Sequence, residues 1–106
     1  MVKVKEILER IDYLQFIGEA DQSIIEIIQL DVLNSRKDVL CWCSDKNLEE
    51  LKKLKAGTII CSNKALKLIN EDSECNYILV DNPRFVFASV LKEFFLSSSI
   101  EESAEK

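Results

Sequence analysis

The residues of this chain best suited to chemistry are four cysteines, one tryptophan and a few polar side chains, and no histidine accompanies them. Histidine is the commonest general base near neutral pH. A Ser, Cys or Lys nucleophile needs an activating partner, and none is evident in the sequence. The sequence therefore predicts no catalytic residue among these 106 positions.

The cysteines are Cys41, Cys43, Cys61 and Cys75. Structural zinc sites usually combine two Cys-x2–4-Cys pairs or add histidines, and the spacing here does neither. Cys41 and Cys43 are two positions apart, so they share one face of a predicted strand, and Cys61 ends another apolar run. Small buried side chains suit such positions. We therefore expect reduced thiols in the core, with no metal and no cofactor.

Trp42 is the only tryptophan, and Ser44, Asp45 and Asn47 follow it. An indole ring stacks on nucleobases, and hydroxyl, carboxylate and amide groups hydrogen-bond to them. Further polar residues follow the next two apolar runs: Ser62, Asn63, Asp81 and Asn82. All of them fall beyond the carboxyl ends of predicted strands, where parallel α/β sheets bind ligands. A second interpretation makes Trp42 a core or edge aromatic and the polar residues helix caps.

Length and composition describe one ordinary globular domain. The chain has a mass of 12.2 kDa, with 47% hydrophobic and 31% charged residues. Its longest apolar runs are shorter than the roughly 20 residues of a membrane span. The net charge of −5, with lysines interleaved among acids, argues against a nucleic-acid partner. The charged start, MVKVKEILER, is unlike a signal peptide, so we expect a cytoplasmic protein.

The N-terminal part of the chain predicts a helix and a hairpin. Apolar residues recur with helical spacing between Val4 and Ile11. Segments 13–17 and 24–30 are typical of strands, and the polar residues between them are typical of a turn. We therefore expect these two strands to pair as a hairpin.

From Val39 onward, strands alternate with helices. The predicted strands are 39–43, 58–61 and 77–80, and the predicted helices are 46–55, about 65–69 and 83–95. Alternation at this spacing indicates right-handed βαβ crossovers. The predicted fold is α/β, with a small, mostly parallel sheet, flanking helices, and the N-terminal helix and hairpin at an edge. The domain spans residues 1–96, and the polar residues 97–106 form a linker or tail.

Cap signals support these helices. Ser44 or Asp45 caps the helix 46–55 and Gly57 ends it, whereas Ser62 or Asn63 caps the next helix. In the last helix, Asn82 is the N-cap and Pro83 takes the first helical position, where no backbone N–H is needed.

Several local strings, in this order, resemble one protein family. They are the N-terminal helix, D-x-x-I at residues 21–24, VLCWC running into SDKN, K-A-G-T-I-I at residues 55–60 and V-D-N-P-R-F at residues 80–85. Together they resemble the N-terminal domain of UDP-3-O-acylglucosamine N-acyltransferase, an enzyme of lipid A synthesis. That domain is similar in design to the first domain of the Mur ligases. The resemblance covers about residues 3–96.

The resemblance implies a role in recognising a UDP-sugar during lipid A or cell-envelope glycan synthesis. In the family, a following domain of hexapeptide repeats builds a trimer and carries the catalytic histidine. These residues contain neither the repeats nor a histidine, so we expect no activity from them alone, and a trimer only if such repeats follow. A Mur-ligase-like protein would continue into a glycine-rich ATP loop, which the sequence lacks.

The family's uridine motif places an aromatic residue, an asparagine and a tyrosine at intervals of three. Two alignments are open: Trp42, Asp45 and Leu48, or Cys41, Ser44 and Asn47. The first keeps a stacking ring but replaces the amide with a carboxylate, which accepts hydrogen bonds only and repels phosphate. The candidate substrate-binding residues are therefore Trp42, Ser44, Asp45 and Asn47. The alternative function is a stand-alone interaction or scaffold domain that has lost nucleotide binding.

Overall fold

The computed structural model describes residues 2–69 and 73–96, and its centre is a five-stranded sheet in the order β2-β7-β6-β5-β4. The strands are β2 (Gln15–Ile17), β4 (Glu26–Ile27), β5 (Val39–Trp42), β6 (Ala56–Ser62) and β7 (Glu74–Val80). All neighbours pair in parallel except β2, which runs antiparallel to β7. Two further strands, β1 (Val2–Lys3) and β3 (Ser23–Ile24), form a separate antiparallel pair. The predicted α/β fold with a mostly parallel sheet is confirmed.

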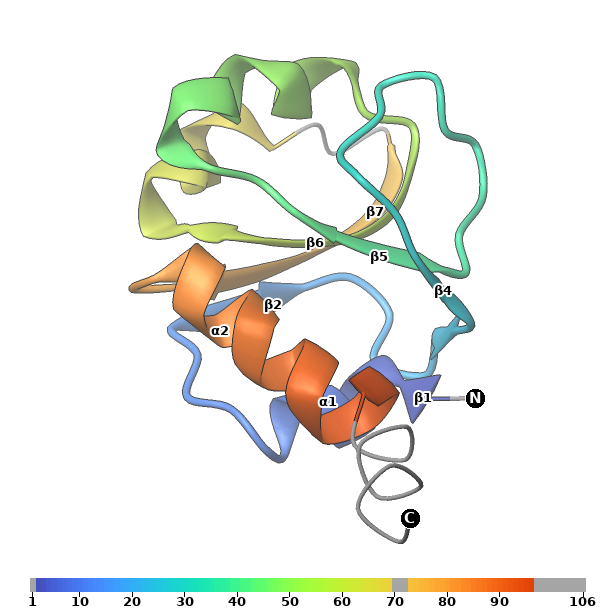
Figure 1. The fold of residues 1–106 in the computed structure, drawn as a ribbon. Coiled ribbons are helices and arrows are strands. Elements are labelled where there is room, and N and C mark those ends of the chain that lie inside the picture. Colours follow the sequence, from blue (N-terminus) through green and yellow to red (C-terminus); the bar gives the residue numbers. More distant parts are fainter. Residues whose placement is uncertain (1, 70–72, 97–106) are drawn as a thin grey trace, which may run out of the picture.

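Helices cover both faces of this sheet (Figure 1). The 3-10 helices η1 (Asp45–Lys53) and η2 (Asn63–Leu68) lie on one face. On the other lie α1 (Val4–Leu8) and α2 (Pro83–Val90), and α2 continues as the π-helical segment η3 (Leu91–Leu96). In the resulting three-layer arrangement, β5, β6 and β7 lie between two layers of helices.

The burial of the central strands follows from this layering. Every residue of β6 is buried, and so is all of β7 after Glu74. Successive side chains of a strand point to opposite faces, so each strand supplies two cores. Leu40 and Ile60 pack towards α1 and α2, whereas Cys41 and Cys61 pack towards η1 and η2. Continuous apolar runs such as VLCWC therefore belong to strands that are covered on both sides.

The predicted N-terminal hairpin is wrong. β2 pairs with β7 at one edge of the sheet, and β4 pairs with β5 at the other. The predicted strand 24–30 is divided between β3 and β4, and the Ile25 N–H donates to Asp38 O at 2.8 Å. Pairing with the buried central strands therefore prevails over pairing across the local turn.

Several predicted boundaries also shift. The first helix ends at Leu8, and the predicted helix 46–55 is a 3-10 helix with a kink at Asn47. Gly57 does not end that helix but lies inside β6 with a φ of +112°, where a Cβ atom would approach Val39 Cγ2 to 3.3 Å. The predicted cap of α2 is confirmed, because the Phe85 N–H donates to Asn82 Oδ1 at 3.2 Å.

Two other expectations concern the C-terminal tail and membrane-spanning helices. The predicted tail, residues 97–106, lies outside the described residues. Within the described part of the chain, no helix has the length and apolar character needed to cross a membrane.

Candidate functional site

Trp42 is the last residue of β5, and its side chain lies on the face of the sheet that α2 covers. Its ring centroid is 6.2 Å from that of Phe87, with the two ring planes tilted by 32°. The indole is only half-buried, unlike the three strand residues that precede it. Trp42 is thus both a packing partner of α2 and a partly accessible aromatic surface.

A hollow of about 480 Å³ opens beside this indole, and we call it the indole pocket. It is lined by Ile27, Ile28, Gln29, Leu30, Trp42, Ser44, Asn47 and Phe87. These residues come from the end of β4 and the segment after it, the end of β5, the start of η1 and the middle of α2. Because η1 and α2 lie on opposite faces, the pocket occupies the crevice beyond the strand ends where parallel α/β sheets bind ligands.

Ser44 and Asn47 form the polar side of the indole pocket. The Asn47 N–H donates to Ser44 O at 3.0 Å, and Asn47 Nδ2 donates to Ser44 Oγ at 3.2 Å. The kink of η1 at Asn47, with φ −112° and ψ 16°, accompanies these contacts. An amide has two N–H donors and an acceptor oxygen, so Asn47 keeps a donor and an acceptor for a ligand. The pocket therefore combines Trp42 of one predicted alignment with Ser44 and Asn47 of the other.

Asp45, the fourth predicted site residue, is directed elsewhere. Ser62 Oγ donates to Asp45 Oδ1 at 2.8 Å, and Lys64 Nζ lies 3.4 Å from Asp45 Oδ2. The hydrogen bond from Ser62 and the nearby Lys64 lower the pKa of this carboxyl group, which stays ionised. Asp45 therefore joins η1 to η2 and does not line the indole pocket.

These contacts also bear on the second interpretation, in which the polar residues after the strands are helix caps. Ser44 precedes η1 and Ser62 precedes η2, but neither side chain accepts a capping hydrogen bond. Ser44 accepts from the Asn47 amide instead, and Ser62 donates to Asp45. Of the predicted caps, only Asn82 caps its helix through its side chain.

A second hollow of about 530 Å³ adjoins the indole pocket, sharing Trp42 and Ser44 with it. Its other lining residues are Asp45, Lys46, Asp81, Asn82, Pro83 and Arg84. Two cationic and two anionic side chains thus face the same space. A ligand in the indole pocket can extend into this hollow, which has balanced charge.

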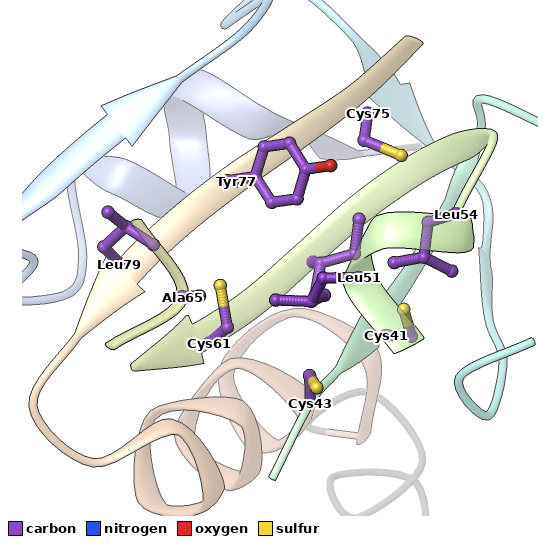
Figure 2. Packing of buried hydrophobic residues seen from close by; sticks show 10 residues of the cluster. Cys41, Cys43, Leu51, Leu54, Cys61, Ala65, Cys75, Tyr77 and Leu79 are labelled. Atoms are coloured by element: carbon purple, nitrogen blue, oxygen red, sulfur yellow. The ribbon is translucent and has the colours of Figure 1, made fainter. Parts of the chain in front are cut away.

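The cysteines belong to the core cluster that also contains Leu51 of η1 and Ala65 of η2 (Figure 2). All four are free and buried, which confirms their predicted place in the core. Burial raises the pKa of Cys41 and Cys61 to about 12 and that of Cys43 to about 11, and it also raises the pKa of Cys75. The thiolate is the reactive form, so these side chains are poor nucleophiles near neutral pH. Among the described residues, no three acidic or cysteine side chains are grouped as metal ligands.

Two contributions to the indole pocket were not predicted. Phe87 lies within the predicted helix 83–95, and residues 27–30 lie within the predicted hairpin strand 24–30, neither of which was predicted to line a site. The aromatic character of Phe87 was visible in the sequence. Its place beside Trp42 depends on the packing of α2 against β5. No local sequence pattern indicates that long-range contact.

No protein-family model matches this chain, and no curated protein matches it in sequence. The functional interpretation of the chain therefore depends on its own residues, on their geometry and on the resemblance of its local strings.

Proposed function

We propose that this domain recognises the nucleotide of a UDP-sugar and serves as the N-terminal substrate-recognition part of an N-acyltransferase in lipid A or cell-envelope glycan synthesis. Nucleotide recognition is supported by the indole pocket, where a half-buried Trp42 faces the same hollow as the Asn47 amide, whereas the enzyme and its pathway are proposed from the sequence resemblance alone. Its volume of about 480 Å³ falls within the range of roughly 300–1,000 Å³ for small-molecule sites.

A uracil ring fits the chemistry of this pocket. Its flat face stacks on the indole of Trp42, and such contacts contribute about 1–3 kcal/mol for each base. The edge of uracil presents one N–H between two carbonyl oxygens. The Asn47 oxygen accepts from that N–H and its remaining amide N–H donates to a carbonyl, so a single side chain reads this edge.

The phosphates and sugar of the ligand then extend into the second hollow. Lys46 and Arg84 attract the diphosphate there, while Asp45 and Asp81 oppose it. The pairing of Asp45 with Lys64 reduces that opposition. Because the charges of the hollow balance, we expect weak binding, in the millimolar range, about −4 kcal/mol.

The acyl transfer itself is assigned to another part of the enzyme. The chain has no histidine, and burial holds the pKa of its thiols well above neutral pH. A domain of this kind contributes binding energy from a remote part of the substrate, which helps to position the reacting group.

The test is a titration of the chain with UDP-N-acetylglucosamine, followed by the fluorescence of its single tryptophan. We expect a saturable change in fluorescence with UDP-N-acetylglucosamine. An adenosine diphosphate sugar, such as ADP-glucose, should not produce this change. Asn47→Ala should weaken the response about tenfold or more, the loss expected when a buried polar edge of a ligand is left unpaired. Asn63→Ala is the matched control, because this exposed asparagine lies at the start of η2 and lines neither hollow.

One observation favours the alternative, a non-catalytic interaction domain. Trp42 packs against Phe87 and belongs to the core beneath α2, so its presence has a purely structural explanation. That alternative predicts no response to either nucleotide sugar. Equal responses of the Asn47→Ala variant and the unmodified chain would also contradict recognition of the uracil edge.

A further inference from the structure

A third hollow, of about 280 Å³, lies between the segment that follows α1 and the first turns of α2. We call it the acid-rimmed pocket. Ile11, Phe85 and Val86 supply its apolar walls, and its rim is formed by Arg10, Asp12, Asp81, Asn82 and Ser89. It shares no lining residue with the indole pocket, whereas Asp81 and Asn82 also line the second hollow.

The rim of this pocket carries a net negative charge, from Asp12 and Asp81 against Arg10. The Arg10 guanidinium is paired with Glu93 at 3.4 Å. Asp12 and Asp81 take part in none of the ion pairs formed by residues 2–69 and 73–96. Arg84 does not line this pocket; it lines the second hollow. Asp12 and Asp81 therefore face this pocket without an ion pair, and Asp81 also faces the second hollow.

The apolar wall includes an unusually exposed aromatic side chain. Phe85 is 68% exposed although it stands in the first turn of α2. The hydrogen bond from its N–H to Asn82 Oδ1 fixes the backbone at this point. Binding energy at interfaces concentrates where large side chains meet preformed apolar pockets.

We propose that the acid-rimmed pocket docks a basic peptide segment of a partner protein, with one apolar side chain of that segment inserted against Phe85. Charge complementarity selects this partner. The two rim carboxylates attract Lys and Arg, and the net charge of −5 steers a basic segment towards the domain. The same carboxylates repel nucleic acids and anionic membranes.

The experiment uses the whole chain and a fluorescein-labelled nonapeptide with a central leucine, two lysines on each side and glycine and serine elsewhere. Fluorescence anisotropy should show saturable binding that weakens as salt is added. Phe85→Ala should weaken binding about tenfold or more, as expected for loss of an anchor contact. Asp12→Asn with Asp81→Asn should weaken binding and remove most of its salt dependence.

Two controls separate this pocket from the rest of the surface. Leu33→Ala removes another side chain that is 79% exposed, and Asp21→Asn neutralises an acid of the exposed ion pair with Lys5. Both variants should bind the peptide like the unmodified chain. Thermal unfolding of each variant verifies that it remains folded.

Four results with the labelled peptides would overturn the proposal. They are no binding of the lysine peptide at millimolar concentration, equal binding of a peptide with glutamates in place of lysines, equal binding of a peptide with serine in place of leucine, and no effect of Phe85→Ala. Self-association of the chain that Phe85→Ala abolishes, measured by sedimentation, would assign the pocket to a second copy and would equally contradict a basic partner.

Discussion

Replacing Trp42 by alanine separates the two roles that the structure gives this residue. The side chain is half-buried, packs on Phe87 and belongs to the core beneath α2. Full truncation of a buried aromatic costs about 3–5 kcal/mol. Since the indole is only partly buried, we expect a loss of stability below that range, about 2 kcal/mol.

The same substitution should also weaken the affinity of the chain for the UDP-sugar. Loss of a base–aromatic stack costs about 1–3 kcal/mol, which corresponds to a roughly 5- to 150-fold weaker affinity for the UDP-sugar. Trp42→Phe is the matched variant, because it keeps a stacking ring and most of the contact with Phe87. It should recover most of the stability and part of the affinity.

Urea denaturation and isothermal titration calorimetry of the three proteins measure these two quantities. Trp42→Ala should remain folded and lose measurable binding, while Trp42→Phe binds at an intermediate level. A loss of about 3–5 kcal/mol in stability with no change in ligand binding would refute the stacking role and would leave Trp42 as a core residue.

Four further predictions concern catalysis, the buried thiols, Gly18 and Asn82. The isolated chain should transfer no acyl group to a UDP-sugar above the uncatalysed background, as measured by mass spectrometry of the product. Burial raises the pKa of Cys41 and Cys61 to about 12 from 9.0, so their contribution to stability is complete below about pH 9 and is lost as the pH rises towards 12. Urea denaturation between neutral pH and about pH 10.5 should show this fall, and Cys41→Ala should reduce it. Gly18→Ala should lower stability by about 1–3 kcal/mol in thermal unfolding, because Gly18 has a φ of +132° and a Cβ atom there would lie 2.9 Å from Asn76 Cα. Asn82→Ala should lower stability by about 1 kcal/mol in thermal unfolding, because it removes the side-chain cap of α2.

The parts of the fold that were predicted correctly are those fixed by local chemistry. Three continuous apolar runs each followed by a helical pattern indicated buried parallel strands, and Asn82 with Pro83 marked the start of α2. Both signals depend on neighbouring residues alone. They are therefore visible in the sequence without knowledge of the strand order.

The errors arose where distant pairing decides the outcome. β2 has three residues and β4 has two, so neither carries enough pattern to reveal its partner. The turn residues between them are equally compatible with a hairpin and with the observed separation to opposite edges. Gly57 was misassigned for a similar reason, because its positive φ belongs to a close approach of Val39 to β6 and not to a helix end.

Three of the four residues predicted for the candidate site lie around one hollow. Trp42, Ser44 and Asn47 do line one pocket, whereas the direction of Asp45 depends on Ser62 and Lys64, which are 17 and 19 positions away. Phe87 could not be assigned to the pocket for the same reason. Polar residues after a strand indicate which side chains gather beyond the strand ends, but long-range contacts determine which of them face the same hollow.

The most direct test of nucleotide recognition is a measurement of intermolecular nuclear Overhauser effects in the complex with a UDP-sugar. The chain has a single indole, so its ring protons can be identified without ambiguity. We predict cross-peaks between the uracil H5 and H6 protons and the ring of Trp42, together with a shift of the Asn47 side-chain amide signals. Saturating ligand that leaves the Trp42 and Asn47 signals unchanged, or that contacts only residues outside the indole pocket, would contradict the proposed function.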